Sequence, residues 1–263
     1  MILQSAQLDP VVEARNLPDR VADELLTRVL VGELPAGDQL PPERVLADEL
    51  GVDRTSLRMA LQQLSRMHLL RAVRGSGITV LDYRQHAGLD FLAAALEAPS
   101  VFLGGAFLME ALDHYHRAMP AVTMLAFSRA TPADIRALDS LFEQQLQLLN
   151  AGASLDAVQE IELDLQDAIV QLCRDTTLQL IANSTRSLRR MLGRKLLELT
   201  NPRELVQTQR MMVRAVLQGG DKALQQAERL RLLQDEHNQK LRAYLATLPP
   251  NPVRTQPWRR ERA

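Results

Sequence analysis

The feature that most constrains the fold is the stretch LADELGVDRTSLRMALQQL, residues 46–64. An apolar-periodic segment ends at Gly51, and a second one begins directly after Asp53. Glycine adopts the left-handed conformation that ends many helices, and aspartate is a favoured N-cap. The stretch therefore predicts two helices, over about 42–50 and about 54–67, joined by a tight turn.

The second predicted helix has two chemically different faces. Leucines form one stripe, and the opposite face carries Arg54, Arg58, Gln62 and Ser65. In a helix-turn-helix, such a helix lies in the major groove, where arginine donates two parallel hydrogen bonds to guanine. Thr55 and Ser56, in its first turn, can bond to phosphate. The alternative interpretation is a solvated helix face with no ligand.

A β-hairpin is predicted after this helix, because two β-prone runs, 69–73 and 77–81, flank the turn sequence RGSG. Such a wing lets its glycines approach a duplex closely while Arg74 reaches a minor groove or a phosphate. Residues 54–84 contain six arginines and a single acid, Asp82, although the net charge of the chain is −1. Any attraction to nucleic acid is therefore local.

Residues 17–81 resemble the winged helix-turn-helix head of the GntR family of bacterial transcription regulators. The resemblance is carried by LPPER, by GVDRTSLR and by the glycine-rich wing. It implies a sequence-specific DNA-binding regulator. By position it also implies DNA contacts at Arg44, Arg54, Thr55, Ser56, Arg58, Arg74 and Gly75. Relatives often have a threonine or serine that touches phosphate where this chain has Asp53, so we assign Asp53 a capping role only.

After about residue 82 the pattern is helical, so the expected fold is mostly α, with an all-α antiparallel helical bundle behind the head. The expected helices are about 86–97, 100–128 with a break near Pro120, 131–150, 155–173, 176–199, 203–218 and 221–247. The expected domains are an N-terminal arm (1–16), the head (17–82), the helical effector-binding and dimerisation domain (83–248) and a Pro/Arg-rich disordered tail (249–263).

The helical part resembles the effector-binding domain of the FadR subfamily of these regulators. The similarity is clearest in AGLDFLAAAL, residues 87–96, and in RMLGRKLLELTNPREL, residues 190–205. It implies control by a small metabolite, either an acyl-CoA or an organic acid. Arg190 and Arg194 are the candidate side chains for its carboxylate or phosphate. An ion-paired helix face is the alternative role for these two arginines.

We expect neither a metal nor another cofactor. Many members of the subfamily hold a metal through an aspartate and three histidines, and the resemblance places that aspartate at Asp164. Ala168 stands where the first histidine is expected, and Gln209 and Arg210 stand where the second is expected. His114 and His116 are two residues apart, so on a helix they point away from each other.

The acidic residues Glu160, Glu162, Asp164 and Asp167 could suggest an enzyme. Their spacing spreads them around a helix, and no glycine-rich phosphate loop or nucleophile constellation accompanies them. We therefore expect a transcription regulator that binds a palindromic double-stranded operator as a homodimer. An effector-independent regulator, whose helical part serves only dimerisation, remains the alternative.

The lone Cys173 excludes an internal disulfide and suits a reducing compartment, and it is expected to be a buried structural thiol. The N-terminal segment has no signal-peptide pattern, and no stretch is long and apolar enough to span a membrane. The expected location is the cytoplasm.

Overall fold

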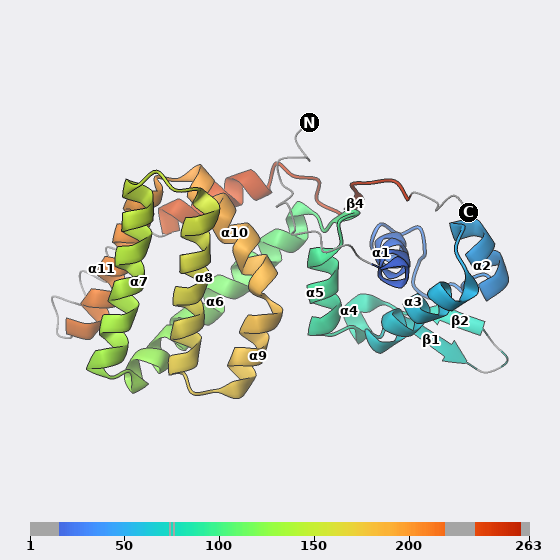
Figure 1. The fold of residues 1–263 in the computed structure, drawn as a ribbon, viewed down its shortest axis with the longest axis horizontal. Helices are drawn as coiled ribbons and strands as arrows, with labels where there is room; N and C mark the ends of the chain where they lie inside the picture. The colour runs from blue at the N-terminus through green and yellow to red at the C-terminus, as the bar shows by residue number, and fades with distance from the viewer. Residues whose placement is uncertain (1–15, 74, 76, 219–234, 259–263) are drawn as a thin grey trace. The chain divides into compact units, whose positions relative to one another are not determined.

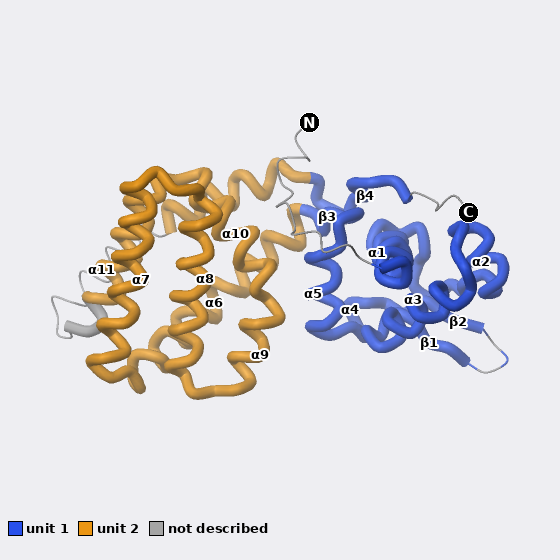
Figure 2. Tube along the Cα trace, viewed as in Figure 1, with its two compact units in different colours: residues 1–104, 249–263 blue, residues 105–248 orange. Residues whose placement is uncertain are grey.

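The computed structural model describes residues 16–73, 75, 77–218 and 235–258. The chain forms two compact units (Figure 2). Residues 1–104 and 249–263 belong to the first, which we call the head unit, and residues 105–248 belong to the second, the helical unit. Residues 83–104, which we expected to belong to the helical domain, are thus part of the head unit.

The head unit is a winged helix-turn-helix, as predicted, with a short extension that was not predicted (Figure 1). Its elements are α1 (Leu17–Leu30), α2 (Glu43–Leu50), α3 (Arg54–Arg66), β1 (Leu70–Val73), β2 (Gly77–Val80), α4 (Tyr83–His86), α5 (Leu89–Glu97), β3 (Val101–Phe102) and β4 (Val253–Arg254). The antiparallel hairpin β1–β2 sets Leu70 opposite Val80. The second antiparallel pair, β3–β4, joins parts of the chain that are far apart in sequence.

The turn between α2 and α3 has the predicted chemistry. Gly51 ends α2 with φ 69° and ψ 42°, the left-handed conformation that glycine adopts without a steric penalty. Asp53 caps α3, since its carboxylate accepts hydrogen bonds from the N–H groups of Thr55 and Ser56, both at 2.9 Å. Leu50 and Leu57, on either side of the turn, are fully buried. The turn therefore fixes the position of α3.

The helical unit consists of long helices, as predicted. They are α6 (Gly105–Arg129), α7 (Pro132–Asn150), α8 (Leu155–Leu172), α9 (Thr176–Ser184), α10 (Arg186–Leu199), α11 (Pro202–Gln218) and a helix over residues 235–245. The α8 helix packs against α6, α7 and α10. One apolar cluster contains Phe142, Ile169 and the buried free thiol of Cys173. No helix in the described ranges combines the length and apolarity that crossing a bilayer requires.

The helices expected from about residues 86 and 100 begin at Leu89 and Gly105, and two helix interruptions also differ from the prediction. The α6 helix continues through Pro120 without the expected break. The helix expected over 176–199 is divided at Thr185, whose φ of −103° and ψ of 7° leave the helical region and whose hydroxyl donates to the carbonyl of Ile181. Threonine side chains compete for backbone groups in this way. The expected helix over 221–247 falls partly outside the described residues.

The tail expected to be disordered is the main correction. Residues 249–258 follow a defined path over the head unit, with β4 paired to β3. Arg254 forms ion pairs with Glu24 and Glu33, so its charge is neutralised by α1 and the turn after it. The Pro/Arg-rich composition predicted disorder. That prediction was wrong because composition contains no information on these distant partners. The expected arm, residues 1–16, lies outside the described residues except for Asn16, and so do residues 259–263.

Candidate nucleic-acid interface and buried polar cluster

The α3 helix directs its polar face to the surface of the head unit. Leu57, Leu61 and Leu64 are buried in the core and orient the helix, while Arg54, Thr55 and Arg58 are exposed. The Arg58 side chain remains 65% exposed although its Nε donates to Glu43 Oε2 of α2 at 2.7 Å. The structure thus brings two predicted contact residues, Arg54 and Arg58, to one accessible helix face.

Arg44 lies on α2 and forms an exposed ion pair with Asp48 at 3.4 Å. Exposed pairs of this kind contribute little to stability and exchange readily. A phosphate that binds here would compete with Asp48 for Arg44 and with Glu43 for Arg58. The acids of α2 therefore partly neutralise the arginines of this surface, a feature that the arginine count alone does not show.

The N-terminus of α3 is already occupied by its cap. Besides the two backbone N–H groups, Asp53 accepts a hydrogen bond from the Ser56 hydroxyl at 2.6 Å. The hydrogen bonds from the side chain and the backbone of Ser56 lower the pKa of Asp53, so the carboxylate is held ionised. Ser56 can donate its hydroxyl to phosphate only after it leaves Asp53, whereas Thr55 does not have this constraint.

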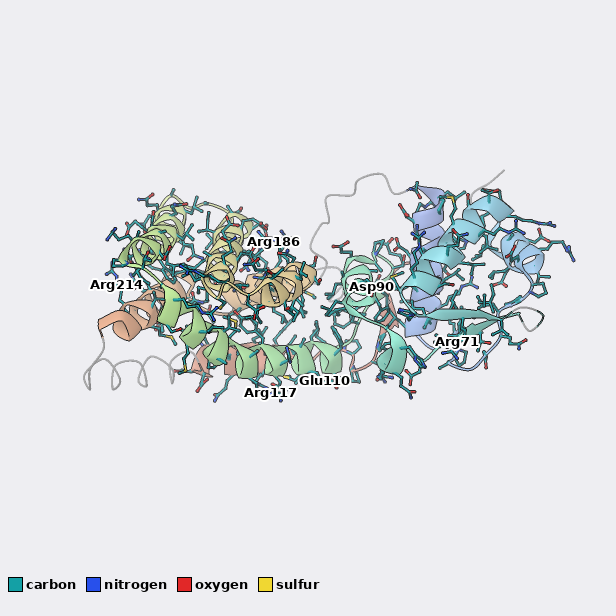
Figure 3. The ribbon with its side chains drawn as sticks, turned by 90° about the horizontal axis from the view of Figure 1, so that it is seen from below. Arg71, Asp90, Glu110, Arg117, Arg186 and Arg214 are labelled. Atoms are coloured by element: carbon teal, nitrogen blue, oxygen red, sulfur yellow. The ribbon has the colours of Figure 1, made fainter. Side chains whose placement is uncertain are left out.

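The wing presents basic and glycine residues at the surface. Arg71 is exposed on β1 (Figure 3), and Gly75, in the turn between the two strands, is also exposed. Arg74, the predicted wing contact, lies outside the described residues. The wing is anchored to the head by an isolated bridge between Gln39 and Thr79.

A second site-like arrangement is buried in the helical unit. We call it the buried polar cluster: the hydrogen-bonded Gln145, Glu162, Gln166, Arg189 and Gln209, together with Gln159, three residues before Glu162 on α8. Gln145, Gln159 and Glu162 are buried, and the other three are partly buried. Glu162 is its centre, since it accepts hydrogen bonds from Gln166 at 2.9 Å, Gln145 at 3.1 Å and Gln209 at 3.4 Å. Burial raises the pKa of Glu162, and also that of the buried Tyr115, to which the nearby Glu162 charge contributes.

Several atoms of this cluster have no hydrogen-bond partner among the described residues: Gln145 Oε1, Gln159 Oε1, Gln159 Nε2 and Arg189 Nε. Gln159 is only 1% exposed, and its amide packs so closely over Gly193 that a Cβ there would lie 2.5 Å from Nε2. Buried polar atoms without partners destabilise a fold, so their presence is a reason to look for a ligand.

The predicted effector residues lie elsewhere. Arg190 pairs with Glu160 at 2.7 Å, and Arg194 pairs with Asp156 at 2.6 Å and with Glu198 at 2.7 Å. Both arginines thus contact the acidic surface of α8 or their own helix. Arg189 was not among the predicted residues; it precedes Arg190 and points about 100° away from it around the helix. The buried Leu188 and Leu192 of α10 could have indicated which arginine turns inward.

Asp164, the residue aligned with a metal ligand, is exposed, and its Oδ1 lies 3.3 Å from Arg186 Nη2. Within the parts of the chain that the structure describes, no group of three His, Cys, Asp or Glu side chains is arranged to hold a metal ion.

Comparison with known proteins agrees with this architecture. A family model described as bacterial regulatory proteins, gntR family, matches residues 17–80, and a model of the FCD domain matches residues 119–233. The HTH-type transcriptional regulator Mce2R of Mycobacterium tuberculosis is 34% identical over 184 residues, which cover 68% of this chain and 72% of that protein.

Two further matches are more distant or shorter. The fatty acid metabolism regulator protein of Pasteurella multocida is 34% identical over 95 residues, 36% of this chain and 39% of that protein. The solved structure of Lar, which controls the expression of the Listeria monocytogenes agr system, is 16% identical with a TM-score of 0.48 and covers 88% of this chain and 98% of that chain. Mce2R and the fatty acid metabolism regulator protein are both named as regulators and not as enzymes. The chain belongs to the GntR family: it is a DNA-binding transcription regulator with an N-terminal helix-turn-helix head and an FCD domain.

Proposed function

We propose that the protein binds a palindromic operator as a homodimer and that a small organic acid in the buried polar cluster controls this binding. One head reads only a few base pairs, so two-fold symmetry is the usual way to reach a specific site. The observation that carries the effector proposal is the set of buried, unpartnered amide and guanidinium atoms around Gln159 and Arg189, counted among the described residues.

On the head, the proposed DNA contacts are Arg44, Arg54, Thr55, Ser56, Arg58, Arg74 and Gly75. Arg54 and Arg58 lie on the exposed face of α3 and have the fork geometry that reads guanine. The others position the head on the backbone. Because Arg44 and Arg58 must first leave Asp48 and Glu43, binding exchanges protein ion pairs for phosphate or base contacts.

The chemistry of the cluster favours an organic acid over an acyl chain. Arg189 Nε and Gln159 Nε2 are donors that match carboxylate oxygens, and the two glutamine carbonyls match hydroxyl groups. A hydrocarbon chain in the same place would leave these atoms unsatisfied. Arg190 and Arg194 remain the second proposed location. A ligand there has to displace carboxylates that already bind both guanidinium groups, whereas Arg189 pairs with Asp167 through Nη2 at 2.7 Å and has its Nε without a partner among the described residues.

A thermal-shift screen of the full chain tests the effector proposal. The probes are di- and hydroxycarboxylic acids and acyl-CoAs of several chain lengths. A ligand present at 100 times its Kd stabilises the native state by about 2.7 kcal/mol, a shift that is easily measured. We expect stabilisation by an organic acid that Gln159→Leu abolishes and Arg194→Ala leaves intact. The reverse pattern places the site at Arg194, and no shift with any probe favours the effector-independent regulator.

DNA binding is tested with a duplex that the wild-type protein selects from a random pool. We expect the affinity to fall steeply as salt increases, because phosphate contacts release counterions. A flat salt dependence contradicts the proposed contact set. Sedimentation of the protein with the duplex gives the stoichiometry, and a single copy on each selected site contradicts the homodimer.

A further inference from the structure

The C-terminal residues return to the DNA-binding head. Residues 249–258, which we call the clasp, belong to the head unit, whereas residues 235–248 before them belong to the helical unit (Figure 2). The chain therefore passes between the units at two places, after Gly104 and after Leu248. The first passage is the ordinary linker of a two-domain chain, and the second connects the last helix to the clasp.

Arg254 of the clasp compensates a buried carboxylate in the head. Its Nη1 lies 2.7 Å from Glu24 Oε2, and its Nη2 lies 3.0 Å from Glu33 Oε2. Glu24, on α1, is only 2% exposed and has one other cationic partner, Arg28, within the described residues. A buried carboxylate is strongly destabilising when a partner is removed, so Arg254 is part of the head's internal structure.

Trp258 contacts the helix-turn-helix itself. Its indole N–H donates to the carbonyl of Leu50 at 3.0 Å, and Leu50 is the last residue of α2, directly before the turn at Gly51. The Arg20 guanidinium carbon lies 5.9 Å from the centre of the Trp258 ring, within the range of a cation–π contact. One clasp side chain thus contacts both α1 and the carboxyl end of α2.

The path of the clasp is fixed by backbone contacts as well. Strand β4 pairs with β3, and Thr255 adds a hydrogen bond from its N–H to the carbonyl of Ser100 at 2.9 Å. Gly104 has φ +93°, and a Cβ at this position would lie 2.4 Å from the carbonyl oxygen of Pro250. Only glycine allows this close approach, so the outgoing and returning chain segments run side by side within the head unit.

Upstream of the clasp, the last helix reaches the interior of the helical unit. His237, Asn238, Leu241 and Leu245 on residues 235–245 are buried there. His237 Nδ1 has no hydrogen-bond partner among the described residues. A single continuous segment therefore carries buried polar groups of the helical unit at one end and Trp258, at the turn of the helix-turn-helix, at the other.

We propose that the clasp is an integral part of the DNA-binding head and that the last helix and the clasp together form a second connection through which the helical unit controls α2 and α3. The connection differs from the first passage, after Gly104, because it ends on α2, the element that positions the proposed DNA-reading helix. This proposal does not depend on the identity of the effector.

Hydrogen exchange of the full chain, read by mass spectrometry, tests the first half. In Arg254→Ala we expect exchange in peptides covering α1 and residues 46–58 to rise about tenfold, because a charge-assisted pair is lost. Peptides of α8 stay unchanged. Arg254→Lys, which keeps the charge, should restore part of the protection, and Trp258→Phe should affect residues 46–58 alone. Arg117→Ala, at an exposed arginine of α6, is the matched control (Figure 3).

If α1 and residues 46–58 exchange as in wild type in both Arg254→Ala and Trp258→Phe, the clasp is not part of the head and the proposal is wrong. Should Arg254→Ala fail to fold, the milder Trp258→Phe decides alone, since it removes one hydrogen bond and retains an aromatic ring. These readouts involve no DNA, so they are independent of the proposed operator contacts.

A glycine insertion tests the second half. Four glycines placed between Leu248 and Pro249 leave every clasp contact possible but make the link between the last helix and the clasp longer and flexible. Coupling between two sites acts in both directions. If the connection couples the helical unit to the head, adding the selected duplex to the wild-type protein should change the hydrogen exchange of residues 235–245. We expect the insertion to abolish this response while duplex affinity stays within about threefold. A wild type without the response, or an insertion variant that keeps it, overturns the proposal.

Discussion

The head unit and the helical unit treat buried polar groups in opposite ways. In the head, Glu24 is paired with two arginines, and the buried Thr27 hydroxyl donates to the carbonyl of Asp23 at 2.7 Å. In the helical unit, Gln145 and Gln159 bury amide atoms that no described residue bonds. Both units fold from amphipathic helices, so helix amphipathicity does not explain the difference in how their buried polar groups are paired.

The head performs its function on its surface, where α3 and the wing present arginines, and its interior has only to be stable. The helical unit has interior polar atoms that no described residue bonds, and such atoms destabilise a fold. Unpaired interior polar groups are typical of ligand sites, because a ligand that binds only the native state stabilises it. This difference is consistent with the proposed division of roles, in which DNA binds at the surface of the head unit and a metabolite binds inside the helical unit.

The largest expected effect is on the stability of the head. Leu57→Ala removes a fully buried side chain beside the turn and should lower the free energy of unfolding by about 2–5 kcal/mol. Trp258 is the chain's only tryptophan and lies on the head, so its fluorescence in a urea titration reports this loss. Gln159→Leu should leave the free energy of unfolding, followed by circular dichroism in urea, almost unchanged. A loss as large as that of Leu57→Ala would contradict the contrast between the two interiors.

The next effect is on DNA. Arg58→Ala should weaken binding to the selected duplex by about 1–3 kcal/mol and relax the base preference, because a base-reading fork is lost. Gel-shift titrations against the selected and a scrambled duplex measure both changes. Arg117→Ala is the control. An Arg58 variant that weakens both duplexes equally would show that Arg58 contacts only the backbone.

A smaller effect concerns pH in the helical unit. Asp139 accepts hydrogen bonds from Arg210 and Arg214 at 2.7–2.9 Å, which hold the pKa of its carboxyl well below the usual range. Because the pKa of Asp139 is lower in the native state than in the unfolded state, its ion pairs stabilise the fold at pH values above the ordinary aspartate pKa. This stabilisation is lost as the pH falls through the pKa of the native state. Asp139→Asn should cost about 1 kcal/mol at neutral pH. In urea titrations followed by circular dichroism, the difference should shrink towards acid; a pH-independent difference would contradict this.

The smallest expected effect is at Glu43. Its exposed pair with Arg58 contributes less than about 0.5 kcal/mol to stability, so Glu43→Gln should leave the urea midpoint almost unchanged. Affinity for the selected duplex should rise about two- to fivefold at low salt, since one competing negative charge is gone. Glu110→Gln, at an exposed glutamate of α6, is the control (Figure 3). A loss of affinity would instead show that Glu43 orients Arg58 for binding.

The helix-turn-helix, its wing and the helical character of the rest could be predicted from the amino-acid sequence alone. Gly51, Asp53 and the leucine stripe of α3 act through neighbours a few residues away, so their signals are local and readable. The exposed arginines of α3 followed from the same periodicity. The proposed metabolite site did not, because Arg189 and Arg190 differ only in the direction of each side chain, and packing against α8 decides that direction.

The position of the C-terminal residues could be seen only in the folded structure. A stretch rich in proline and arginine has the composition of a disordered tail, yet Arg254 meets Glu24 across 230 positions of sequence and Trp258 meets Leu50 across 208. Contacts at such separations depend on the complete fold, since a buried carboxylate attracts a guanidinium only after the surrounding helices have assembled.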